Sequence, residues 1–270
     1  MKVKARQCGL TLMEMTVVIA VMALLAVFGL PAIRALINSF ESEAGAKAMI
    51  SAGLASGRAI AASQHHYAGI RFQKAYDPND PDLLNAPQYM IFIVHDFGAT
   101  GLAPGFRAVK GIKPIKLPDS LGVMDLRYRT NPDPQYSGDS PIDEDDDIDG
   151  FKEVRDTTTF SIIFSPSGKL LLHDVRVRNR DGERDSSSTE SYDDIFNKDE
   201  KVEAEEAMFY QDDYADLGLG QESSRGKFII YDRVKFRQAY ERGRAYSEYL
   251  EDLADSMIHI NPYTGTMIKK

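Results

Sequence analysis

One acidic run in the sequence has the residue types and the spacing of a cation site. Asp145, Asp147 and Asp149 occupy alternate positions, Gly150 follows them, and Asp156 is twelfth counting from Asp145. Carboxylates at the first, third, fifth and twelfth places, with a glycine to turn the chain, are the pattern of a calcium loop, although the usual twelfth residue is glutamate. The four aspartates therefore predict a calcium site. A solvated acidic loop without metal is the alternative, because acid-rich runs produce such spacing by chance.

No other group of residues suggests catalysis. The five histidines lack the spacing of a zinc site, and the chain has no glycine-rich phosphate loop. Ser165 and Ser167 lie in a turn without the Gly-x-Ser-x-Gly elbow of hydrolases. The sequence therefore predicts a protein that is not an enzyme, with calcium as its one candidate cofactor.

A long apolar run near the N-terminus contains a single charged residue. Residues 10–33 carry only Glu14, and three basic residues precede the run. As a helix the run would extend about 36 Å, enough to cross a bilayer, and the basic residues would place the N-terminus in the cytoplasm. A carboxylate inside a bilayer costs about 2.5–3.5 kcal/mol, so Glu14 needs a partner. Pro31 removes one backbone hydrogen bond near the far end of the helix.

The order of these residues resembles the prepilin motif of type IV pilins and type II secretion pseudopilins. The resemblance rests on Gly9 before the apolar run, Glu14 at the fifth position after it, and Pro31 at the helix-breaking position. It implies that prepilin peptidase cleaves between Gly9 and Leu10 and that the new N-terminus is methylated. It also implies that Glu14 meets the free amine of a neighbouring subunit's Leu10. The usual first mature residue is phenylalanine, and here it is leucine.

The remainder of the chain predicts a helix followed by strands. Apolar residues recur at three- and four-residue steps from Ile33 through Phe40 and the alanines 44, 48, 52, 55 and 59, and Ile50 and Leu54 broaden this stripe. The pattern predicts an amphipathic helix over 34–63 lying on a globular domain. β-Branched and aromatic runs predict strands at 67–72, 89–94, 159–164 and 228–231, a hairpin partner at 169–173, a helix within 234–253 and a last hairpin at 257–268. Residues 54–61, running into the first strand, resemble the H-type minor pseudopilins.

These elements predict an α+β fold, with a long N-terminal membrane-spanning helix and then an antiparallel β-sheet domain, as in pilins. The predicted parts are a leader at 1–9, the membrane and assembly helix at 10–33, its continuation at 34–63, and a β-rich domain at 64–270. Acidic insertions are expected near 129–150 and 180–225, where aliphatic residues are few. The formal net charge of -9 argues against nucleic acid as a partner.

The sequence as a whole predicts a minor pilin or pseudopilin in the inner membrane, with a single pass, a cytoplasmic N-terminus and a periplasmic or extracytoplasmic domain. The expected partners are prepilin peptidase, sibling subunits, an inner-membrane assembly platform and the membrane itself. A membrane-anchored extracytoplasmic ligand-binding protein outside any filament is the alternative. Failure to process the chain at Gly9 would favour that alternative.

Overall fold

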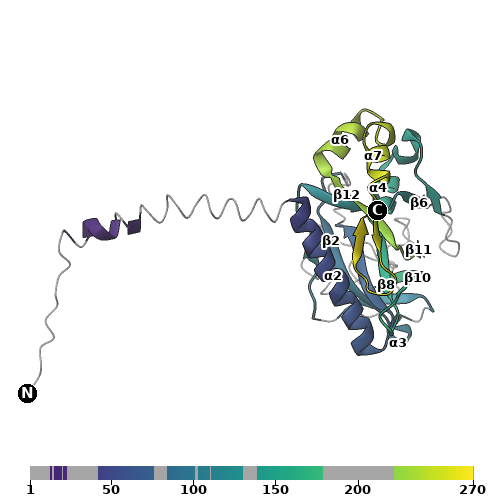
Figure 1. Ribbon diagram of the computed structural model, residues 1–270. Helices are drawn as coiled ribbons and strands as arrows, with labels where there is room; N and C mark the ends of the chain where they lie inside the picture. The colour runs from purple at the N-terminus through teal and green to yellow at the C-terminus, as the bar shows by residue number, and fades with distance from the viewer. Residues whose placement is uncertain are drawn as a thin grey trace, which may run out of the picture.

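The computed structural model describes residues 13, 15–19, 21–22, 42–75, 84–100, 103–109, 111–129, 139–178 and 222–269 (Figure 1). The helices and helical turns from residue 43 onward are α2 (Glu43–Gln64), α3 (Phe97–Thr100), η1 (Asp145–Ile148), α4 (Phe151–Thr158), α6 (Arg233–Glu241), η3 (Tyr246–Leu250) and α7 (Glu251–Ala254). The strands are β1 (Ala68–Lys74), β2 (Gln88–His95), β3 (Gly105–Ala108), β4 (Ile115–Lys116), β5 (Leu121–Met124), β6 (Arg127–Arg129), β7 (Asp139–Pro141), β8 (Phe160–Phe164), β9 (Leu170–Leu171), β10 (Asp174–Arg178), β11 (Glu222–Ser223), β12 (Lys227–Asp232), β13 (Ile258–Ile260) and β14 (Met267–Lys269).

The largest sheet is mixed. Its strands follow the order β11-β10-β3-β2-β1-β8-β9, and β4 pairs with the far end of β2. Most neighbouring strands are antiparallel, but β10 pairs with β3 in parallel, with Val177 opposite Phe106. A parallel pair cannot be joined by a tight hairpin, so the chain passes through β4 to β9 before β10 returns beside β3.

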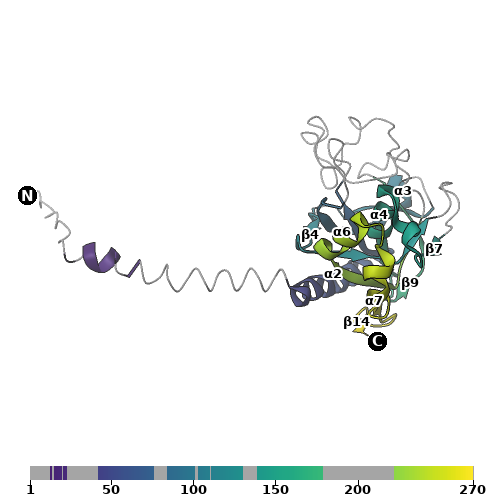
Figure 2. The ribbon, with the colours of Figure 1, turned by 90° about the horizontal axis from the view of Figure 1, so that it is seen from above.

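Helix α2 lies against one face of this sheet (Figures 1 and 2). Its start is capped by the Ser42 hydroxyl, which accepts a hydrogen bond from the Gly45 amide at 3.2 Å. Its end is followed by His65, whose φ of 56° is left-handed and turns the chain toward β1. Apolar side chains of α2, including Ile50 and Leu54, join a core with residues of β1, β2 and β8.

Both faces of the central strands are buried. In β2, Met90, Phe92 and Val94 face the core under α2, while Ile91 and Ile93 belong to a separate cluster on the opposite face. Alternation of this kind follows from the two-residue period of a strand. It explains why the β2 sequence is a continuous apolar run.

A second sheet, in the order β14-β13-β12-β5, carries the C-terminal helices. Its cluster packs Tyr231 of β12 against Phe236 of α6, with ring centroids 5.2 Å apart, and includes Leu250 of η3. The short strands β6 and β7 form a separate two-stranded ladder. The strands predicted at 67–72, 89–94, 159–164, 169–173 and 228–231, and the final hairpin, are confirmed as β1, β2, β8, β9, β12 and the β13–β14 pair.

Two elements of the predicted fold class are wrong. The main sheet is mixed and not purely antiparallel, because β10 pairs in parallel with β3. None of the helices in the described part of the chain has both the length and the apolar composition needed to cross a membrane. That finding contradicts the predicted spanning helix over 10–33, and the single-pass inner-membrane location and membrane partnership that followed from it.

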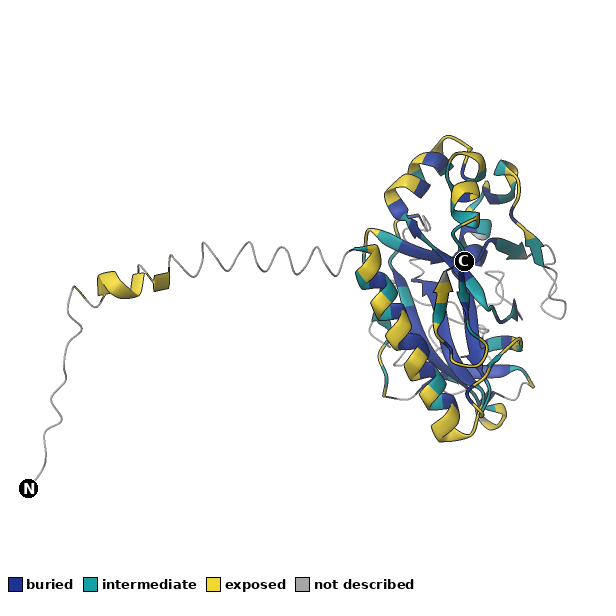
Figure 3. Cartoon of the chain, in the orientation of Figure 1, coloured by how far each residue is buried: buried dark blue, intermediate teal, exposed yellow. Residues whose placement is uncertain are grey.

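The prediction for the face of the 34–63 helix was wrong for its alanines. Those at 44, 48, 52, 55 and 59, expected against the domain, are all exposed, and the exposed side of α2 faces away from the sheet (Figure 3). Ile50 and Leu54 of the same predicted stripe are buried as expected, and Ala46, Gly53, Gly57 and Ala61 complete the buried face. The two glycines let the helix approach the sheet closely: a Cβ built on Gly57 would lie 3.2 Å from the backbone of Gly69 in β1.

Candidate functional site

The residues predicted for processing and assembly, Gly9, Leu10, Glu14 and Pro31, lie outside the described residues. Residues around Glu14 are described: positions 13, 15–19 and 21–22 are helical (Figure 1). Their large apolar side chains belong to three methionines, three valines and one isoleucine, and are 48% to 76% exposed. Apart from Thr16, every described residue of this segment is apolar and exposed, so burial against the rest of the described chain does not stabilise it.

Helix α2 presents a second uncovered surface, which we call the small-residue face. Its members are all exposed alanines and serines on the side away from the sheet: Ala44, Ala48, Ser51, Ala52, Ala55, Ser56, Ala59, Ala62 and Ser63. The face runs about 30 Å along the helix and contains no charged residue. The outer face of a surface helix is ordinarily charged or polar. Helix axes lie roughly 8–10 Å apart according to the side chains in contact, and a face of alanine and serine allows the closest approach.

The predicted calcium ligands are engaged in local hydrogen bonds. Asp145 in η1 accepts from the backbone amides of Tyr246 and Ser247 at 3.0 and 2.8 Å and from the Ser247 hydroxyl at 2.7 Å. The hydrogen bonds from Ser247, followed by that from Tyr246, lower the pKa of Asp145. Asp147 accepts from the amides of Asp143 and Glu144, both at 2.9 Å.

The other two predicted ligands, Asp149 and Asp156, differ in how far they are buried. Asp149 is exposed after η1, whereas Asp156 is buried in α4. Among the described residues, no three side chains of the metal-ligating types come together to hold an ion. The structure assigns Asp145 and Asp147 a role in capping and joining helical turns, and calcium binding stays a prediction.

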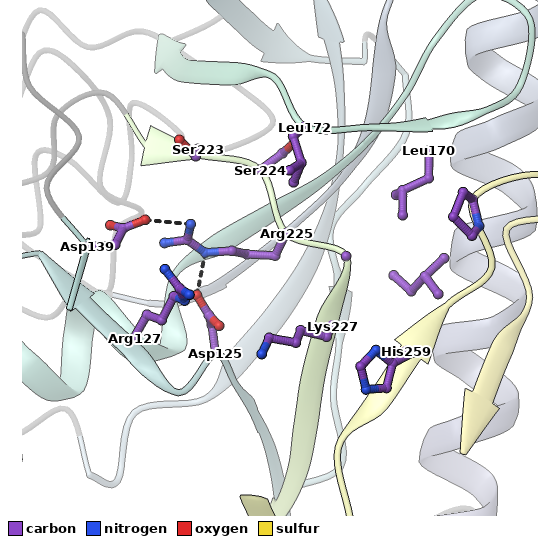
Figure 4. Close-up of a pocket in the computed structure, with 13 residues that line it drawn as sticks. Asp125, Arg127, Asp139, Leu170, Leu172, Ser223, Ser224, Arg225, Lys227 and His259 are labelled. Carbon is purple, nitrogen blue, oxygen red and sulfur yellow. Dashed lines mark ion pairs between the residues drawn. The ribbon is translucent and has the colours of Figure 1, made fainter. Parts of the chain in front are cut away.

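A cluster of charged residues that the sequence did not single out joins three distant segments. Arg225, between β11 and β12, forms ion pairs with Asp125, directly after β5, and with Asp139 at the start of β7 (Figure 4). The Arg225–Asp139 distance is 2.6 Å, and all three side chains are 13% exposed or less. Backbone hydrogen bonds hold the segments in place: the Asp125 amide donates to Thr157 O at 2.8 Å and the Arg225 amide to Ser161 O at 2.7 Å.

Burial dominates the ionisation of this cluster. It raises the pKa of Asp125 to about 6, even though the neighbouring Arg225 guanidinium acts to lower it. Burial also acts to lower the pKa of Arg225, but Asp125 and Asp139 outweigh it and raise that pKa. The guanidinium therefore stays charged, while the Asp125 carboxyl takes up a proton in mildly acidic solution.

This shift predicts a specific dependence of stability on pH. The folded pKa of Asp125 lies above the ordinary 3.8, so the native state binds more protons than the unfolded chain between about pH 4 and 6. The contribution is fully present below about pH 4 and is lost as the pH rises through 6. We expect the free energy of unfolding of the wild type, relative to Asp125→Asn, to fall by on the order of 2 kcal/mol from pH 4 to pH 7. Urea unfolding of both proteins at pH 4 and at pH 7 measures this change. A difference in unfolding free energy between the two proteins that stays constant with pH would contradict the prediction.

A buried ion pair anchors β11 beside this cluster. Arg71 of β1 contacts Glu222 of β11 at 2.5 Å, and the two side chains are 4% and 2% exposed. Arg71 also donates to Gln73 at 2.8 Å and to the Ser161 hydroxyl at 3.1 Å, and that hydroxyl donates to Glu222 at 2.8 Å. The pair therefore ties β1 and β8 to the short strand from which the Ser223–Lys227 segment continues.

Comparisons of the chain with protein-family models, with curated proteins and with solved structures give no match. The comparisons therefore lend no support to the resemblance to pilins and pseudopilins. Any proposal about function rests on the residues of this chain and on their geometry.

Proposed function

We propose that this protein is a structural, pilin-like subunit of a filament, processed by prepilin peptidase and assembled through its N-terminal helix. The observation that carries the proposal is the combination of two uncovered helical surfaces in the N-terminal part of the chain. One is the exposed apolar helix at residues 13–22, where described, and the other is the small-residue face of α2. The occupants that we propose for both are the corresponding helices of neighbouring subunits.

Repeated use of one helix suits a filament. A head-to-tail contact that does not close into a ring generates a helical assembly, and its subunits share the same surfaces. The small-residue face is long and uncharged, so helices could pack along it without burying an unpaired charge. The sheet domain lies on the other side of α2 and would remain on the outside of such a bundle (Figure 3).

Glu14 and Leu10 supply the proposed specificity of docking. Packed among apolar helices, an unpaired Glu14 carboxylate would be costly, and the free amine created at Leu10 by cleavage after Gly9 would relieve that cost. Processing and assembly would then be coupled, because an uncleaved chain has no amine at that position. This mechanism follows from the resemblance and from electrostatics, and it concerns residues outside the described part of the chain.

A test of the proposal places a charge on the small-residue face. Lysine is nearly as good a helix former as alanine, so Ala52→Lys and Ala55→Lys should leave the fold of the subunit intact. We expect both variants to lose most of their incorporation into filaments, measured as the fraction recovered in sheared filaments relative to the cellular level. Gln238→Lys, at an exposed position of α6, is the matched control and should assemble normally.

A ligand-binding protein outside any filament is the second candidate, and the cavity beside Arg225 is the observation that favours it. Absence of the wild-type chain from sheared filaments would favour this candidate, whereas normal assembly of both alanine variants would only remove the small-residue face from the assembly mechanism. In a background of Cys8→Ser, which removes the one native cysteine, Ala55→Cys gives an independent measurement. A thiol-specific photo-crosslinker attached at Ala55→Cys should join the chain to a neighbouring subunit, and the same label at Gln238→Cys should give no such product.

A further inference from the structure

A cavity of about 700 Å³ lies beside the Arg225 cluster (Figure 4). Its walls come from separate parts of the chain: the β5–β7 region, the β9–β10 connection, the segment 223–227 and β13 with the residues after it. Small-molecule sites in proteins commonly measure roughly 300–1,000 Å³ and combine apolar walls with a few polar groups. No residue of α2 lines this cavity, so it is separate from the proposed assembly surface.

The charges that line the cavity do not balance. Arg225 is engaged by the carboxylates of Asp125 and Asp139. Arg127 and Lys227 add two further cationic groups, in a chain whose net charge is -9. His259 adds an imidazole, which can donate a hydrogen bond.

These three groups are half-buried, and Arg127 interacts with the Asp125 carboxylate only through its charge. The side chains of Arg127, Lys227 and His259 make no hydrogen bond or ion pair within the described part of the chain. Lys227 and His259 are direct cross-strand partners in the antiparallel β12–β13 pair, so their side chains leave the same face of the sheet. Asp125 compensates part of the Arg127 charge, and an anion in the cavity would supply the counter-charge that Lys227 lacks among the described residues.

The opposite wall is apolar. Leu170 and Leu172 lie across the cavity from the basic groups in Figure 4, and Ile260 and Pro262 complete the lining on the β13 side. Leu172 is 74% exposed, which leaves a large apolar side chain uncovered at this surface. A purely ionic ligand would leave the apolar wall exposed to water. We therefore expect the ligand to have an apolar part that contacts this wall.

We propose that the cavity binds a small organic anion with an apolar body, its phosphate or carboxylate head held by Arg127, Lys227 and His259. The apolar body lies along Leu170, Leu172 and Ile260. The Arg225 ion pairs hold the walls in position and leave the other basic groups available to the ligand.

The test uses the full chain and titrates it calorimetrically with octyl phosphate and octanoate, each below its micelle concentration. At least one should bind, and the stronger of the two identifies phosphate or carboxylate as the preferred head group. Inorganic phosphate and neutral octyl glucoside should each bind at least about tenfold more weakly than that probe. Inorganic phosphate lacks the apolar chain, and octyl glucoside lacks the anionic head group. Equal binding of octyl glucoside, equal binding of inorganic phosphate, or no binding by either amphipathic anion would overturn the proposal.

Variants locate the site. Lys227→Gln removes the charge and keeps a polar side chain that is one atom shorter, and we expect it to weaken binding of the amphipathic anion about tenfold or more. Lys235→Gln removes an exposed lysine from α6 and should leave binding unchanged. Identical affinities for the two variants would place the bound anion elsewhere and refute the site. Since α2 is not involved, the outcome is independent of whether the chain assembles into filaments.

Discussion

Replacing Arg71 with methionine should destabilise the protein by about 3–5 kcal/mol, because the change leaves the buried Glu222 carboxylate without its cation. Methionine fills most of the arginine volume, so the loss reports the charge and the hydrogen bonds more than an empty space. The Ser161 hydroxyl would still donate to Glu222, but it does not replace the lost positive charge. Urea unfolding of the wild type and the variant at pH 7 measures the difference.

The double variant Arg71→Met with Glu222→Gln separates the ion pair from general disruption. Glutamine has nearly the same shape as glutamate and can still accept from Ser161, but it carries no charge to desolvate. The double variant should therefore be more stable than Arg71→Met alone. If the second substitution lowers stability further, the cost of Arg71→Met arises from packing and not from an unpaired carboxylate.

This ion pair also matters for the cavity, because Glu222 precedes the segment Ser223–Lys227 that forms one wall. The sequence gives little warning of it: Arg71 lies in a run that reads as an ordinary strand, and Glu222 lies 151 residues away. In the strand order, β10, β3 and β2 lie between β11 and β1, so the sheet must curve for Glu222 to reach Arg71 and its cross-strand neighbour Ser161. Long-range pairing of this kind leaves no periodic pattern in the sequence.

Local patterns predicted the individual strands well. The run at 89–94 became β2 with only small changes at its ends, and the turn at Asn261–Gly265 joins β13 to β14 as expected. These predictions succeeded because β-branched and aromatic residues favour extended backbone and because turn residues mark the ends. The parallel pairing of β10 with β3 was missed, because no turn signal links strands that are 65 residues or more apart in the chain.

The orientation of α2 shows how composition can mislead. Alanines at three- and four-residue steps were interpreted as the buried stripe, because alanine is apolar enough to count toward a core face. The structure buries Gly53 and Gly57 instead, where the lack of a side chain lets the helix approach Met90 and the β1 backbone. A hydrophobicity pattern gives glycine little weight, although it marks close approach. The resulting error concealed the small-residue face, which is now the main support for the assembly proposal.

The residues of the cavity could not have been predicted together. Arg127, Lys227 and His259 come from strands in different parts of the sequence, and each alone reads as an ordinary partly exposed polar residue. The acidic run at 145–149, in contrast, drew attention through its spacing. The structure uses two of its aspartates to accept backbone hydrogen bonds. Spacing along the chain reveals a site only when one local segment supplies its groups.

Replacing Gly69 with alanine should cost about 3 kcal/mol or more, at the upper end of the range for overpacked interiors. Gly69 lies in β1 between β2 and β8, opposite Ile93 and Ile163. A Cβ there would overlap the carbonyl oxygen of Ile162 and lie 3.0 Å from the Ile163 Cα. These are backbone atoms of a central strand, so they cannot swing aside as the end of a flexible side chain would.

The matched control for this substitution is Gly98→Ala in α3. A Cβ at Gly98 would meet only the Asp96 carboxylate, at an ordinary van der Waals distance of 3.5 Å. The free energy of unfolding of that variant should therefore lie within about 0.5 kcal/mol of the wild-type value. The backbone of Gly69 also supports α2 through Gly57, and displacement of β1 should therefore loosen the helix that carries the small-residue face. Faster amide hydrogen exchange in both β1 and α2 of Gly69→Ala would show this coupling. Equal stability of the two glycine variants would mean that β1 and β8 do not approach each other as closely as the structure indicates.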